Sequence, residues 1–183
     1  MTQPFYDLAI RNAVVVDGTG APAYRANVFV RGDTIVDIDR RNESEATARR
    51  VIDANGRTLA PGFIDMHAHG DPLVQSFENF LAMGVTTVVL GQDGESVQLE
   101  SASAEQPFAR WASAAEAAGV QVNVAALSGH GSIRHLAQIP DSVRHLSAEQ
   151  TDRMRAVLRA DLQAGTFGMS TGLEYVPGIY SEP

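Results

Sequence analysis

From residue 62 onward, short apolar runs of strand length alternate with longer segments whose apolar side chains recur at helical spacing. The predicted strands are 62–66, 85–90, 121–127 and a fourth beginning near 167, and the predicted helices are 73–83, 107–118 and 148–164. This alternation predicts an α/β fold, in which helices cover a parallel sheet. Four strands can form a small open sheet or half of an eight-stranded barrel. A half-barrel has two unpaired edges, so we expect the chain to be incomplete as a folding unit.

Residues 1–60 have a different hydrophobic pattern, in which short apolar runs are separated by polar turns. Arg31-Gly32-Asp33 lies between two such runs, and this pattern predicts a β-hairpin. A second hairpin is predicted with its turn at Ala54-Asn55-Gly56-Arg57, and the polar stretch 42–50 is expected to be a loop. This change in hydrophobic pattern predicts two domains, a strand-rich segment over 1–60 and an α/β segment over 61–183.

Composition excludes several function classes. The net charge of −8 argues against a surface for nucleic acid or anionic membrane. Cysteine is absent, and all 14 basic residues are arginine, so no thiolate ligand, disulfide or Schiff-base lysine can come from this chain. The N-terminus has no basic start, and no apolar run is long enough to cross a membrane. These features predict a cytoplasmic protein.

The segment Pro61-Gly62-Phe63-Ile64-Asp65-Met66-His67-Ala68-His69-Gly70-Asp71 is an apolar strand that ends in His-x-His. Alternate residues of a strand point to the same side, so His67 and His69 should project together, with Asp65 and Asp71 near the same line. Two imidazoles on one rigid element form half of a zinc-type site. The alternative is a histidine pair on a solvated strand edge. The apolar strand and the acidic flanks favour the metal site.

The other predicted strands also end in polar or titratable groups, and functional residues of parallel βα folds collect at these ends. The groups of interest after the second, third and fourth strands are Asp93, His130, Arg134, Glu174 and Tyr175. Each also has a structural interpretation: Asp93 as a turn cap, His130 as a hydrogen-bonded loop residue, and Arg134 and Glu174 as solvated charges. We take His135 and His145 as structural or surface residues.

With these strand ends identified, the chain resembles the amidohydrolase superfamily, and within it the N-acyl-D-amino-acid deacylase branch. The resemblance extends over essentially the whole chain. It is carried by the His-x-His block, by Gly84-Val85-Thr86-Thr87-Val88-Val89-x-Gly91, by Gly129-His130-Gly131-Ser132-x-Arg134, and by Gly168-x-Ser170-Thr171-Gly172-Leu173-Glu174-Tyr175-x-Pro177-Gly178. The last block is the most specific to this branch.

The resemblance implies a small β-sandwich segment followed by the first half of a metal-dependent (β/α)8 barrel, and zinc-dependent hydrolysis of an N-acyl-D-amino acid. It implies one or two zinc ions, with His67 and His69 as ligands. Where many members have a cysteine ligand, this chain has Asp93. We expect Glu174 to bridge the metals in place of a carbamylated lysine, with Asp93 as the competing candidate. Tyr175, Arg134 and His130 are expected to contact the small-molecule substrate.

The resemblance also implies functional residues that this chain lacks. Two further histidines and the catalytic aspartate would lie beyond Pro183, so no catalytic residue is assigned here. Either the sequence is a fragment or the enzyme consists of two chains; we expect a two-chain enzyme, with the C-terminal half as the second chain, and a homo-oligomer stays open. The alternatives are another amidohydrolase activity, on a cyclic amide or dipeptide, and a non-catalytic scaffold subunit.

Overall fold

The structure is a computed structural model that describes residues 5–41, 44, 46–97 and 107–181. The chain divides into two compact units, Met1–Pro61 and Gly62–Pro183, and each is described by itself. Within the described residues, every helix is too short or too polar to cross a lipid bilayer.

The first unit is a five-stranded sheet. Its strands are β1 (Phe5–Val15), β2 (Tyr24–Arg31), β3 (Thr34–Asp39), β4 (Thr47–Asp53) and β5 (Thr58–Leu59). The order is β3-β2-β1-β4, and β5 also pairs with β1. Buried side chains of β1 and β2, among them Ala9, Ala13, Val28 and Phe29, form its core. The hairpin predicted at Arg31-Gly32-Asp33 is confirmed by the antiparallel pairing of β2 with β3.

The second predicted hairpin is wrong. β4 and β5 do not pair with each other, because both pair with β1 in the parallel direction. β1 is 11 residues long, and β4 and β5 pair with successive parts of the same edge of β1. The turn between them is held to β1 by hydrogen bonds from Ala54 N to Arg11 O and from Gly56 N to Asn12 O. The expected loop over 42–50 is also wrong in part, because β4 already begins at Thr47, whereas residues 42, 43 and 45 lie outside the described part of the chain.

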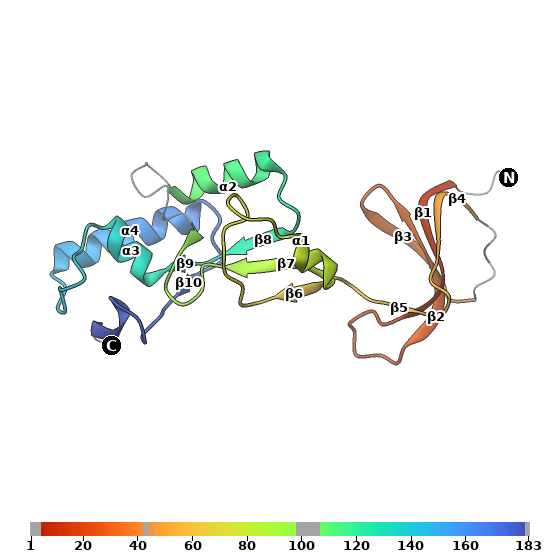
Figure 1. The fold of residues 1–183 in the computed structure, drawn as a ribbon, viewed down its shortest axis with the longest axis horizontal. Coiled ribbons are helices and arrows are strands. Elements are labelled where there is room, and N and C mark those ends of the chain that lie inside the picture. Colours follow the sequence, from red (N-terminus) through yellow and green to blue (C-terminus); the bar gives the residue numbers. More distant parts are fainter. Residues whose placement is uncertain (1–4, 42–43, 45, 98–106, 182–183) are drawn as a thin grey trace. The chain divides into compact units, whose positions relative to one another are not determined.

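The second unit contains the predicted parallel strands, β6 (Phe63–Asp65), β7 (Val85–Leu90), β8 (Asn123–Ala126), β9 (Ser128–Gly129) and β10 (Met169–Ser170). β6, β7 and β8 form one parallel sheet, and β9 pairs with β10 in parallel (Figure 1). Only Leu127 separates β8 from β9. The strands therefore follow one another in chain order, which confirms the α/β class and brings their carboxyl ends to one edge.

The helices match the predictions where local sequence signals are strong. α2 (Pro107–Ala118) has the predicted bounds, and α4 (Ala148–Gln163) begins at the capping box of Ser147 and Gln150. α1 covers only Glu78–Ala82, which is shorter than the predicted helix over 73–83. The residues before α1 form a turn instead, because Asp71 accepts hydrogen bonds from the amides of Leu73, Val74 and Gln75. α3 (His130–Leu136) was not predicted, and a 3₁₀ turn, η2, covers Gly178–Tyr180.

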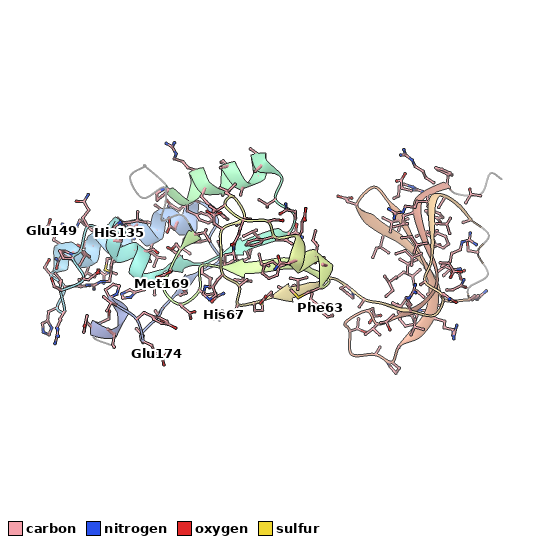
Figure 2. All side chains as sticks on the ribbon, in the orientation of Figure 1. Phe63, His67, His135, Glu149, Met169 and Glu174 are labelled. Carbon is pink, nitrogen blue, oxygen red and sulfur yellow. The ribbon has the colours of Figure 1, made fainter. Side chains whose placement is uncertain are left out.

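The core of the second unit lies between β7 and the helices that pack on it. Val88 and Leu90 of β7 are fully buried and pack with Phe77, Phe108 and Trp111. By contrast, apolar side chains of the outer strands are exposed, including Phe63 on β6 and Met169 on β10, which Figure 2 labels. In the described part of the chain, β6 pairs only with β7 and β10 only with β9, so each has one unpaired edge.

Candidate metal centre

The His-x-His segment directly follows β6. Asp65, the last residue of the strand, accepts a hydrogen bond at Oδ1 from the His67 amide at 3.1 Å. The Ala68 amide donates to Val89 O of the neighbouring strand β7 at 3.1 Å, so the segment stays attached to the sheet edge. The two imidazoles consequently face one another, with their Nε2 atoms 3.2 Å apart.

Asp93 completes the cluster from the turn after β7. Its Oδ2 lies 3.2 Å from His67 Nε2 and 3.3 Å from His69 Nε2. Among the described residues, these three form the one group of histidine and acidic side chains whose ligand atoms converge closely enough to hold a metal ion. The side chains of His67, His69 and Asp93 are 58%, 61% and 39% exposed in this chain.

The spacing of the three ligand atoms fits zinc. Zinc binds histidine nitrogen and carboxylate oxygen at about 2.0–2.2 Å in tetrahedral geometry, and two such ligands are then about 3.3–3.5 Å apart. The observed separations are 3.2, 3.2 and 3.3 Å. The side chains of His67, His69 and Asp93 are therefore the described residues that could hold a metal ion.

Glu174 does not join this cluster, which differs from its expected bridging role. It is exposed on the segment between β10 and η2, and Figure 2 shows it on a different segment from His67. Asp93, the competing candidate, is the carboxylate that lies beside the two imidazoles. The flanking acids have structural contacts instead: Asp65 bonds the His67 amide, and Asp71 accepts from Trp111 Nε1 at 3.1 Å.

A pocket of about 330 Å³ lies beside Asp93. Its titratable lining residues are Asp93, Glu95, His130, His135, Asp141 and Tyr175. Burial, together with the charge of Arg134, lowers the pKa of His130, so this imidazole is neutral near pH 7. Tyr175 is exposed and is one of the residues that line the pocket. Two of the three expected substrate contacts, His130 and Tyr175, therefore line a cavity next to the metal cluster.

Arg134 differs from the expected substrate contact. Its side chain is only 2% exposed, and its Nη2 donates to the carbonyl of Val143 at 2.8 Å. The guanidinium therefore ties α3 to the following loop and does not line the pocket. The sequence alone did not reveal this, because α3 was not predicted and Arg134 was taken to follow a strand end.

Two residues near the cluster were not identified from the sequence. Gln92 and Ser170 make side-chain hydrogen bonds to the backbone around Asp93 and His67. The available signal was their position immediately after β7 and at the end of β10, where polar residues of parallel βα folds often support the site.

Known proteins resemble this chain in sequence and in structure. An amidohydrolase family profile matches residues 50–180. N-acyl-D-glutamate deacylase and D-aminoacylase, both from Alcaligenes xylosoxydans xylosoxydans, are 37% and 34% identical to it, and each match covers 96% of this chain and 39% of the relative. The chain thus spans about two fifths of the length of these relatives.

Solved structures give the same result. N-acyl-D-glutamate deacylase from Bordetella bronchiseptica, crystallised with zinc and a phosphonate inhibitor that mimics the tetrahedral intermediate, superposes with a TM-score of 0.82 at 32% identity, covering 98% of this chain and 41% of that one. A D-aminoacylase structure has the same TM-score and identity over 97% of this chain and 40% of that one. An L-hydantoinase from Arthrobacter aurescens, at 17% identity and a TM-score of 0.53, shares the fold.

Proposed function

This chain belongs to the amidohydrolase family, and from that premise we propose that its protein hydrolyses the amide bond of an N-acyl-D-amino acid at a zinc ion held by His67, His69 and Asp93. The observation that carries the proposal is the convergence of three ligand atoms within 3.3 Å of one another. The relatives named for deacylation of N-acyl-D-amino acids support the substrate class.

In amide hydrolysis, a water oxygen bonds to the acyl carbon, the carbon–nitrogen bond breaks, and the leaving amine takes a proton. A bound zinc ion supplies a Lewis acid for the carbonyl oxygen and lowers the pKa of water toward about 7. The side chains of His67, His69 and Asp93 fix the place of this chemistry at the sheet edge. The adjacent pocket holds the substrate, where the neutral His130 and the phenol of Tyr175 offer hydrogen bonds to its polar groups.

The same proposal includes a fold for the whole protein, a (β/α)8 barrel with a small β-sandwich. Residues 61–183 form the first four strands of a (β/α)8 barrel, and residues 1–60 form part of a β-sandwich. The unpaired edges of β6 and β10 favour this, since an unpaired edge can accept a further strand. Further strands, from the same or a second polypeptide, supply the remaining ligands and the proton-transfer aspartate. We assign no proton-transfer residue to the described part of this chain.

The test is a substrate panel together with a metal analysis of the purified protein. We expect N-acyl-D-amino acids to be hydrolysed in preference to N-acyl-L-amino acids, cyclic amides and β-aspartyl dipeptides. His67→Ala should lose both bound zinc and activity, whereas His145→Ala, which changes a histidine away from the cluster, should keep both. Full activity in His67→Ala would exclude the proposed site. A metal-free protein with no hydrolytic activity would instead favour a scaffold subunit.

A further inference from the structure

The turn that contains Asp93 is held by hydrogen bonds from a side chain on a strand distant in sequence. Ser170, at the end of β10, donates from Oγ to the carbonyl of Gly91 at 2.5 Å and accepts from the amide of Gly94 at 3.1 Å. One hydroxyl thus bonds the backbone on both sides of Asp93. The two bonds join positions 76 and 79 residues apart in the chain.

A second side chain connects the same turn to the His-x-His segment by a hydrogen bond. The Gln92 amide nitrogen donates to the carbonyl of Met66 at 2.8 Å and to that of Val89 at 3.2 Å. Met66 immediately precedes His67, and Gln92 immediately precedes Asp93. The Gln92 carboxamide therefore links the backbone of one ligand to the backbone of another, independently of the bonds that Ser170 makes.

The conformation of Asp93 is one that such contacts stabilise. Asp93 has a φ of +55°, in the left-handed region, and Gly91 and Gly94 of the same turn also have positive φ. Aspartate occupies this region more readily than most residues with a side chain, but still at a cost that surrounding contacts offset. Without them, relaxation of the turn would move the carboxylate away from the two imidazoles.

We propose that Ser170 and Gln92 are positioning residues, which hold the Asp93 carboxylate against His67 and His69 and thereby set the zinc affinity of the site. This inference rests on the proposed metal centre. Neither side chain is a ligand, because each bonds only backbone groups in the described structure. Groups that orient metal ligands contribute about 10–100-fold to metal affinity, and the loss of either side chain should have an effect in this range.

The test compares zinc affinity in the wild-type protein, Ser170→Ala and Gln92→Met, by competition with a chromophoric chelator. We expect each variant to bind zinc at least about tenfold more weakly. Ser170→Thr, which keeps the hydroxyl, should recover most of the affinity. The visible spectrum of the Co²⁺-loaded protein gives a second readout, and we expect its bands to change in Ser170→Ala and Gln92→Met but not in Ser170→Thr.

Ser128→Ala is the matched control. Ser128 is a buried serine that begins the neighbouring strand β9, and its hydroxyl donates to Asp161 of α4 rather than to the Asp93 turn. This variant should lower the melting temperature and leave the zinc dissociation constant unchanged, which separates positioning from general destabilisation.

The outcomes distinguish the inference from the proposed function. If the wild-type protein binds no zinc, the proposed metal centre fails. If the wild type binds zinc and both Ser170→Ala and Gln92→Met bind it equally well with the same Co²⁺ spectrum, the metal centre stands and the positioning roles are overturned. If Ser170→Ala does not fold, Gln92→Met decides the question in the same assay.

Discussion

The carboxylate of Asp93 lies 3.2 Å from the imidazole of His67, although the two residues are 26 positions apart in the chain. The contact exists because β6 and β7 pair in parallel, with Asp65 opposite Val88. Parallel pairing brings the carboxyl ends of both strands to one edge, where His67 and Asp93 follow their strands. This edge is therefore where a metal ion would gain a ligand from each strand.

The two candidate carboxylates can be separated by neutral substitutions. Asp93→Asn should weaken zinc binding by about tenfold or more, because an amide oxygen is a poorer zinc ligand than a carboxylate. Glu174→Gln, the matched change on an exposed residue outside the cluster, should leave the affinity unchanged. Titration of both variants with zinc measures this. The reverse result would restore Glu174 as the ligand and remove Asp93.

Gly172 should tolerate no side chain, since a Cβ there would lie against the backbone carbonyl of Asp93. Gly172→Ala is therefore expected to displace the Asp93 turn and to reduce zinc affinity by about tenfold. Gly168→Ala is the control, because its Cβ would meet only Leu127 Cδ2 at 3.7 Å, an ordinary contact. Equal zinc affinity in the two variants would show that the turn does not depend on this close approach.

Asp161 should give the stability of the protein a specific dependence on pH. Burial raises the pKa of its carboxyl above the usual 3.8, and the hydrogen bond from Ser128 offsets part of this effect. The folded state thus holds the proton more tightly than the unfolded state. The Asp161 carboxyl therefore stabilises the folded state most below about pH 4, and this contribution is lost as the pH rises through the raised pKa.

Urea unfolding between pH 4 and pH 8 measures this effect as the difference between the wild-type protein and Asp161→Asn. The asparagine cannot ionise, so its stability relative to the wild type should increase as the pH rises. A difference that stays constant over the whole range would mean that the carboxyl of Asp161 titrates normally. Comparison within the pair removes the contributions of the other acidic groups.

The one tryptophan of the chain, Trp111, provides a probe of the second unit. It is buried, and its Nε1 donates to Asp71, which also accepts from the Leu73 amide. Asp71→Ala should leave the indole donor without this partner, lower the free energy of unfolding by about 1–3 kcal/mol and shift the tryptophan emission. Asp152→Ala removes an exposed ion pair with Arg155 and should change neither quantity appreciably.

Elements whose sequence signals are local could be predicted from the amino-acid sequence alone. The bounds of α2 and the start of α4 followed from apolar spacing and from the Ser147–Gln150 capping box, because a helix satisfies its hydrogen bonds within its own segment. The pairing of His67 with His69 followed for a similar reason, since residues two apart at a strand end project to the same side. The parallel α/β class followed from the alternation of these elements.

Tertiary structure decided the relationships between distant segments. Nothing in the sequence of β4 or β5 specifies that both pair with β1, because a strand obtains its hydrogen bonds from whichever edge the fold presents. The choice of Asp93 over Glu174 likewise depended on strand pairing and on a left-handed turn fastened by Ser170 and Gln92. Composition and spacing identified the types of ligand, but only the packed backbone determined which carboxylate lies within reach of the two imidazoles.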